Sequence, residues 1–114
     1  MAAKILISDP VDYVCANTLR SHGFQVDQVK LTKEELLEKI KEYDGLIVRS
    51  ETKVTAEVLA AATNLKIVGR AGTGVDNVDC VKATELGVIV MNTPGGNTLS
   101  AAEHTCALIS SMAR

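Results

Sequence analysis

The stretch that decides the fold is LKIVGRAGTGVDNVD, residues 65–79. It begins with a short apolar run, passes an arginine at position 70 and opens into a loop with glycines at positions 72 and 74, before Asp79 signals the start of a helix. This order predicts a strand, a tight loop and a helix. Because glycines carry no side chain, the N–H groups of the loop can approach an anion closely, and Arg70 beside them suits a carboxylate or a phosphate.

The rest of the chain repeats this alternation of short apolar runs and helical segments. Pro10 stops the first run, and Gly23 and Gly87 stand where helix C-caps are expected. Thr32 and Glu35 have the spacing of a capping box at the start of a helix. We expect strands at residues 4–9, 24–29, 45–48, 65–68 and 88–91, and helices at residues 12–21, 32–40, 55–62, 79–86 and 100–114.

Five short strands that alternate with helices predict an α/β fold with a parallel sheet. Right-handed crossovers restrict the topology, and we expect a flavodoxin-like, doubly wound, five-stranded sheet in the order 2-1-3-4-5 with helices on both faces. The polar alternation of residues 24–29 suits a strand at the sheet edge. The 114 residues are enough for one domain with its own core.

Composition excludes several classes of function. The net charge is −2 with both signs interspersed and aromatic residues make up 3% of the chain, which predicts no binding of nucleic acid. No apolar run approaches the roughly 20 residues of a membrane span, and we expect neither a membrane segment nor a signal peptide. The three cysteines form no CxxC pair, which favours reduced thiols in the cytoplasm. Histidine pairs and carboxylate clusters with the spacing of a metal site are missing, and no metal is expected.

Polar residues follow the predicted strands where they end, and carboxyl ends of parallel strands meet at one edge of the sheet, here named the carboxyl edge. Two arginines on neighbouring strands, Arg49 and Arg70, could clamp a small dianion. Each could equally pair with a local carboxylate such as Glu51 or Asp76. The residues that could help them bind an anion, or could instead only cap a helix or stabilise a turn, are Ser50, Gly72, Thr73, Gly74 and Asn97.

The glycine loop is not a dinucleotide fingerprint. GxGxxG requires glycine at position 77, where Asn77 stands, and the acidic residue expected at the end of the next strand is replaced by Asn92. His104 lies inside the last predicted helix, far from any nucleophile, and is better explained as structural. The residues by themselves therefore predict a binding edge for a small anion without catalytic groups.

Three motifs resemble the D-isomer-specific 2-hydroxyacid dehydrogenase family, in particular its members that oxidise 3-phosphoglycerate. They are VRSxTKVT at residues 48–55, GRAGTGVDNVD at residues 69–79 and MNTPGGNxxSxAE at residues 91–103, and the similarity runs through the whole chain. The resemblance implies a flavodoxin-like substrate-binding domain. It also implies NAD-dependent oxidation of 3-phosphoglycerate to 3-phosphohydroxypyruvate, for serine biosynthesis, by a homo-oligomeric enzyme.

By this resemblance, the amides of Gly72, Thr73 and Gly74 would hold the substrate carboxylate, and Thr73 would also contact NAD. Arg49 and Arg70 would face the phosphate, with the side chains of Ser50 and Asn97 nearby.

The family's catalytic arginine, glutamate and histidine belong to its nucleotide-binding domain. We therefore expect residues 1–114 to be the N-terminal part of the substrate-binding domain, without that domain or the C-terminal segment that returns to it. No catalytic residue is expected in this chain, which should be inactive alone. Two alternatives remain: a non-catalytic module that binds small anions or regulates another protein, and a dehydrogenase for another D-2-hydroxy acid. A receiver-like phosphoacceptor is disfavoured, because Arg49 and Asn92 replace its carboxylate and lysine.

Overall fold

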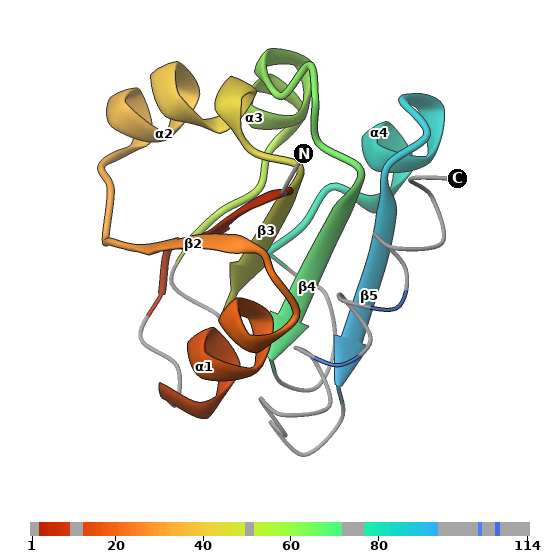
Figure 1. Ribbon diagram of the computed structural model, residues 1–114. Coiled ribbons are helices and arrows are strands. Elements are labelled where there is room, and N and C mark those ends of the chain that lie inside the picture. The colour runs from red at the N-terminus through yellow and green to blue at the C-terminus, as the bar shows by residue number, and fades with distance from the viewer. Residues whose placement is uncertain are drawn as a thin grey trace.

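Five parallel strands form one sheet in the order β2-β1-β3-β4-β5 (Figure 1), which confirms the predicted topology. The computed structural model describes residues 3–9, 13–49, 52–71, 77–93, 103 and 107. The strands are β1 (Lys4–Ile7), β2 (Gln25–Gln28), β3 (Gly45–Val48), β4 (Ile67–Ala71) and β5 (Ile89–Thr93). As predicted, β2 pairs with β1 alone among the described strands and is an edge of the sheet.

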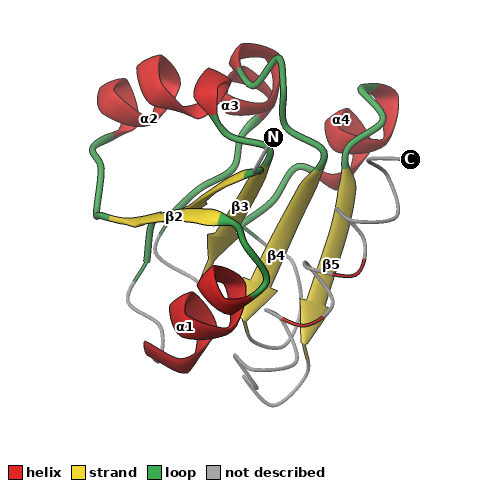
Figure 2. Ribbon diagram, viewed as in Figure 1, coloured by secondary structure: helices red, strands yellow, loops and turns green. Residues whose placement is uncertain are grey.

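Helices cover both faces of the sheet (Figure 2). On one face α1 (Tyr13–Ser21) packs its Ala16 and Leu19 on β1, β2, β3 and β4. On the other face lie α2 (Lys33–Lys39), the short 3₁₀ helix η1 (Ile40–Glu42), α3 (Ala56–Ala61) and α4 (Cys80–Glu85). The helix predicted at residues 100–114 falls outside the described residues except for Glu103 and Ala107, which are helical. None of the helices in the described part of the chain has the length and apolar character needed to cross a membrane.

Three of the predicted helix ends are confirmed, at Thr32, Gly23 and Gly87. The Thr32 hydroxyl accepts a hydrogen bond from the Glu35 N–H at 3.2 Å, and the Glu35 carboxylate accepts one from the Thr32 N–H at 3.1 Å, which completes the capping box. Gly23 and Gly87 have φ of 88° and 75°, the left-handed region that glycine enters without a steric penalty.

The central strand β3 is buried along its whole length, and its side chains divide between two cores. Leu46 and Val48 face α2, α3 and α4, whereas Ile47 faces α1. This alternation follows from the period of two in a strand with both faces covered. Because the side chains in the middle of the sheet are apolar, polar groups that could bind a ligand are expected at its edges.

Only β3 has the predicted bounds; β1 ends at Ile7 rather than residue 9, and the ends of the other strands differ from the prediction by one to three residues. Two of these differences bear on the site. β4 ends at Ala71 rather than residue 68, and β5 ends at Thr93 rather than residue 91, because pairing continues from Arg70 to Asn92 and from Ala71 to Thr93. An apolar run marks the buried part of a strand, not the whole hydrogen-bonded ladder. The correction puts Arg70 inside the sheet, in register with Val48 and Asn92.

Candidate functional site at the carboxyl edge

The segments that follow β3 and β4 are joined by an isolated parallel bridge between Val54 and Val78. The Val54 N–H donates to the Asn77 carbonyl at 2.7 Å, and the Asp79 N–H donates to the Val54 carbonyl at 2.9 Å. Val54 and Val78 are both buried, so the bridge is also an apolar contact. These bonds hold the two segments against each other at the carboxyl edge.

Asn77 connects the two arginines. Its buried side chain donates from Nδ2 to the Arg49 carbonyl at 2.7 Å and to the Thr52 carbonyl at 2.6 Å, and its Oδ1 accepts from Arg70 Nε at 2.6 Å. The amide thereby uses its donors and its acceptor together. One side chain fixes both the main chain after β3 and the guanidinium at the end of β4.

Asp9, two residues after the end of β1, is a second buried group at this edge, with a side chain that is 0% exposed. Its Oδ2 accepts from the N–H groups of Arg49 at 2.7 Å and Thr52 at 3.0 Å, and its Oδ1 accepts from the Thr52 hydroxyl at 2.5 Å. Lys30 Nζ lies 3.5 Å from Oδ1. Burial alone would raise the pKa of Asp9, but the bonds from Thr52 and Arg49 and the charge of Lys30 outweigh it and lower the pKa below its ordinary value.

Because the pKa of Asp9 is lowered in the folded state, the free energy of unfolding depends on pH. Ionised Asp9 stabilises the folded chain fully above its unfolded pKa of about 4, and this contribution is lost as the pH falls through the lower folded value. We expect wild type to be more stable than Asp9→Asn at pH 7 and the gap to shrink below about pH 4. Urea denaturation of both proteins at several pH values measures it. A gap that stays constant down to strongly acidic pH would contradict a contribution from the ionised carboxylate.

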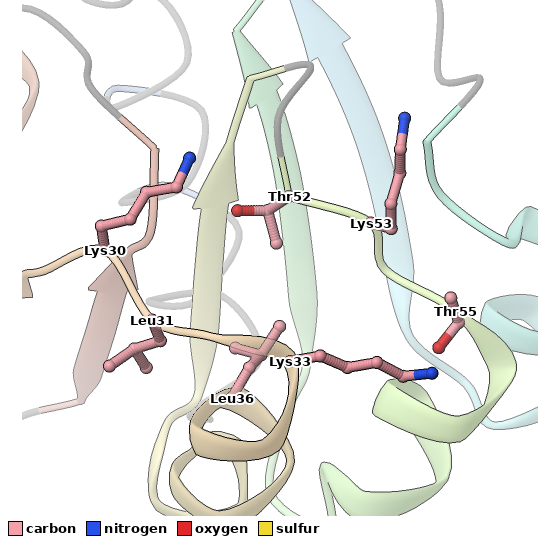
Figure 3. A pocket seen from close by; sticks show the side chains of 7 residues that line it. All are labelled: Lys30, Leu31, Lys33, Leu36, Thr52, Lys53 and Thr55. Atoms are coloured by element: carbon pink, nitrogen blue, oxygen red, sulfur yellow. The ribbon is translucent and has the colours of Figure 1, made fainter.

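A pocket of about 310 Å³ lies beside this network, between the end of β2, α2 and the segment before α3. Lys30 and Lys53 flank Thr52 and both extend toward the carboxyl ends of the strands, while Lys33 extends toward Thr55 (Figure 3). Leu31 and Leu36 supply the apolar part of the lining. Lys30, which is ion-paired with Asp9, and Lys53 therefore bring ammonium groups next to the carboxyl edge, where positive charge favours anions, whereas Lys33 pairs with Glu57 at 3.4 Å.

The structure brings two of the residues in the sequence-predicted site together. Arg49 is exposed and Arg70 half-buried, and Asn77 contacts both. The other members of that site, Ser50, Gly72, Thr73, Gly74 and Asn97, lie outside the described residues. Within the described part of the chain, no group of three or more histidine, cysteine or acidic side chains could hold a metal ion.

Sequence reasoning missed the roles of Asp9, Thr52 and Asn77. In the sequence, Asp9 is simply a polar residue at the end of the first predicted strand, and Asn77 stands out only as a departure from GxGxxG. A signal for Asp9 was present, because the predicted order puts β1 next to β3 and thus Asp9 beside Arg49. For Asn77 the local pattern gives no such signal.

Comparison with known proteins decides the family. The model of the D-isomer specific 2-hydroxyacid dehydrogenase catalytic domain matches residues 5–113. The chain belongs to the D-isomer specific 2-hydroxyacid dehydrogenase family. This confirms the resemblance inferred from the three motifs.

Curated relatives within this family are named D-3-phosphoglycerate dehydrogenase. The human protein is 56% identical over 112 residues, which are 97% of this chain and 21% of the relative. The protein of Archaeoglobus fulgidus is 46% identical over the same share of both chains. This 2-hydroxyacid dehydrogenase chain thus spans about a fifth of the length of the relatives it matches.

Among solved structures, the NAD⁺-bound 3-phosphoglycerate dehydrogenase of Entamoeba histolytica is similar, with a TM-score of 0.77 and 34% identity over 83% of this chain and 34% of that chain. The sheet order and the helices on both faces are therefore those of a known 2-hydroxyacid dehydrogenase structure.

Proposed function

We propose that this chain is the substrate-binding part of an NAD-dependent dehydrogenase that oxidises 3-phosphoglycerate to 3-phosphohydroxypyruvate in serine biosynthesis. The observation that carries the proposal is that Asn77 bonds both the Arg49 main-chain carbonyl and the Arg70 guanidinium, at the ends of neighbouring strands. Two guanidinium groups suit a phosphate, whose oxygens accept several hydrogen bonds at once. The names of the relatives, at 46% and 56% identity, support the same substrate.

In this proposal the phosphate binds at Arg49 and Arg70, with Ser50 and Asn97 nearby, and the carboxylate binds at the amides of Gly72, Thr73 and Gly74. The hydrogen bond from Arg70 Nε to Asn77 sets the plane of the guanidinium, so less side-chain entropy is lost when an anion binds. Lys30 and Lys53 add a positive field beside the site.

NAD would supply the hydride acceptor, and in this chain only Thr73 is proposed to touch it. The carboxyl edge does not fit the pyrophosphate of a dinucleotide. The fingerprint requires glycine at position 77, and the side chain of Asn77 is buried there and held by hydrogen bonds. We therefore assign to residues 1–114 the N-terminal part of the substrate-binding domain, and to a separate nucleotide-binding domain the cofactor and the catalytic groups. A homo-oligomer in the cytoplasm belongs to the same proposal.

An amide NMR titration of the 114-residue chain with 3-phosphoglycerate, D-lactate and NAD tests the proposal. We expect 3-phosphoglycerate to shift the signals of Arg49, Arg70 and Asn77, and D-lactate and NAD to leave them almost unchanged, because only the first ligand carries both a phosphate and a carboxylate. The chain with 3-phosphoglycerate and NAD should form no NADH. Equal shifts with D-lactate would favour a dehydrogenase for another D-2-hydroxy acid. A well-dispersed spectrum without shifts would contradict binding by this domain.

A further inference from the structure

We infer that Asp9 is a positioning residue for the anion site, an inference that rests on the proposed function. Asp9 lies two residues past the end of β1, which is one strand away from β3 and two from β4 in the order β1-β3-β4. Its carboxylate accepts the N–H groups of Arg49 and Thr52 on a single oxygen. It thereby sets the direction in which the chain leaves β3, where Arg49 stands.

The influence of Asp9 continues to Arg70 through a chain of hydrogen bonds. Thr52 donates its N–H and its hydroxyl to Asp9, and its carbonyl accepts from Asn77 Nδ2. Asn77 in turn accepts from Arg70 Nε. Ser8 supports the middle of this chain, since its hydroxyl donates to Thr52 Oγ1 at 3.0 Å. Asp9, Thr52, Asn77 and Arg70 thus form one connected network between β1 and β4.

Electrostatics alone would argue against a carboxylate at this place. A negative charge close to an anion site repels the ligand, and burial of the charge has its own desolvation cost. Asp9 offsets this cost because all its acceptor sites face donors: two main-chain N–H groups, a hydroxyl and the Lys30 ammonium. What the carboxylate contributes to the site is therefore geometry, not charge.

This distinction makes the inference testable by two variants of one residue. Asp9→Asn keeps an oxygen that can face the Arg49 and Thr52 N–H groups, and its NH₂ can face the Thr52 hydroxyl, which can rotate to accept. Asp9→Ala removes every bond. We expect Asp9→Ala to raise the Kd for 3-phosphoglycerate about tenfold, and Asp9→Asn to restore it to within about threefold of wild type, because small misplacements of binding groups have large effects.

Asp44→Ala is the matched control. Asp44 accepts the Lys4 N–H at 2.9 Å and lies 3.2 Å from Lys66 Nζ, but at the opposite, amino edge of the same sheet. Its side chain is 26% exposed. Truncation of either aspartate should lower stability, and only Asp9→Ala should weaken binding. If Asp9→Ala fails to fold, Thr52→Val removes the hydroxyl alone and is expected to weaken binding about threefold.

The closing experiment measures Kd for 3-phosphoglycerate by NMR titration of the whole chain, together with the ¹H–¹⁵N signal of Arg70 Nε without ligand. In Asp9→Ala we expect weaker binding and a shift of the Arg70 signal toward that of an exposed guanidinium, and in Asp44→Ala neither. An unchanged Kd and an unchanged Arg70 signal in Asp9→Ala would overturn the positioning role. If wild type binds no 3-phosphoglycerate, the proposed function fails for this domain, while the Arg70 signal still decides whether Asp9 positions that side chain.

Discussion

Replacement of Asn77 by leucine is expected to lower the free energy of unfolding by about 3 kcal/mol or more. Leucine has a similar size but can make none of the three hydrogen bonds to Arg49, Thr52 and Arg70. The two carbonyls and the guanidinium Nε would then lack these hydrogen-bond partners. Each unsatisfied polar group lowers the free energy of unfolding by about 1–3 kcal/mol when it is buried. The bond from the Val54 N–H is kept, because it uses the main-chain carbonyl of residue 77, so the loss reports on the side-chain amide. Urea denaturation measures the loss.

Asn64→Leu provides the control for this prediction. Asn64 also donates from its Nδ2 to a main-chain carbonyl, that of Lys41 at 2.8 Å, but the bond is exposed, and water can replace the lost partner. Its effect should stay below about 1 kcal/mol. Similar losses in the two variants would show that the buried amide of Asn77 is no more than an ordinary surface contact.

The fold could be predicted from the sequence because its determinants are local. The apolar runs at β1 and β3 mark strands buried on both faces, and the polar alternation of β2 marks an edge. Thr32 with Glu35 and the glycine at position 23 mark helix ends through bonds and dihedral angles that span few residues. Strand ends were predicted less well: β1 ends two residues earlier than expected, and β4 and β5 end later, because their main-chain pairing continues through polar residues.

The site could be predicted only in part, because its network joins residues that are far apart in the chain. Arg49 and Arg70 were found from charge and from the strand order. Asp9 lies 43 positions from Thr52, and Asn77 lies 28 positions from Arg49, so no sequence window shows these bonds. Asn77 was also missed for a chemical reason. The GxGxxG motif shows only that residue 77 does not suit a dinucleotide, and it says nothing of the hydrogen bonds that an amide at this position can make.

Arg70→Lys is expected to weaken binding of 3-phosphoglycerate by about tenfold to a hundredfold, although the charge is kept. Arg70 donates from Nε to Asn77 in a fixed plane, whereas a lysine ammonium is a point charge on a flexible stem. It cannot present a planar fork to a phosphate while it bonds Asn77. Asn77 Oδ1 would lose the donor that Arg70 Nε supplies, and the link from β4 to the main chain at Arg49 would loosen. The Kd from an NMR titration measures the effect.

Arg20→Lys separates this effect from a general change of arginine to lysine. Arg20 lies in the last turn of α1 and donates from Nη2 to the Val26 carbonyl at 3.2 Å, away from the carboxyl edge. Its substitution should leave the Kd unchanged. If Arg70→Lys also bound 3-phosphoglycerate like wild type, positive charge alone would suffice at position 70. The bond to Asn77 would then serve stability only, and recognition of the phosphate would have to depend on Arg49 and on the field of Lys30 and Lys53. If the fixed geometry of Arg70 matters, Arg70→Lys weakens binding. If positive charge alone matters, Arg70→Lys leaves the Kd unchanged.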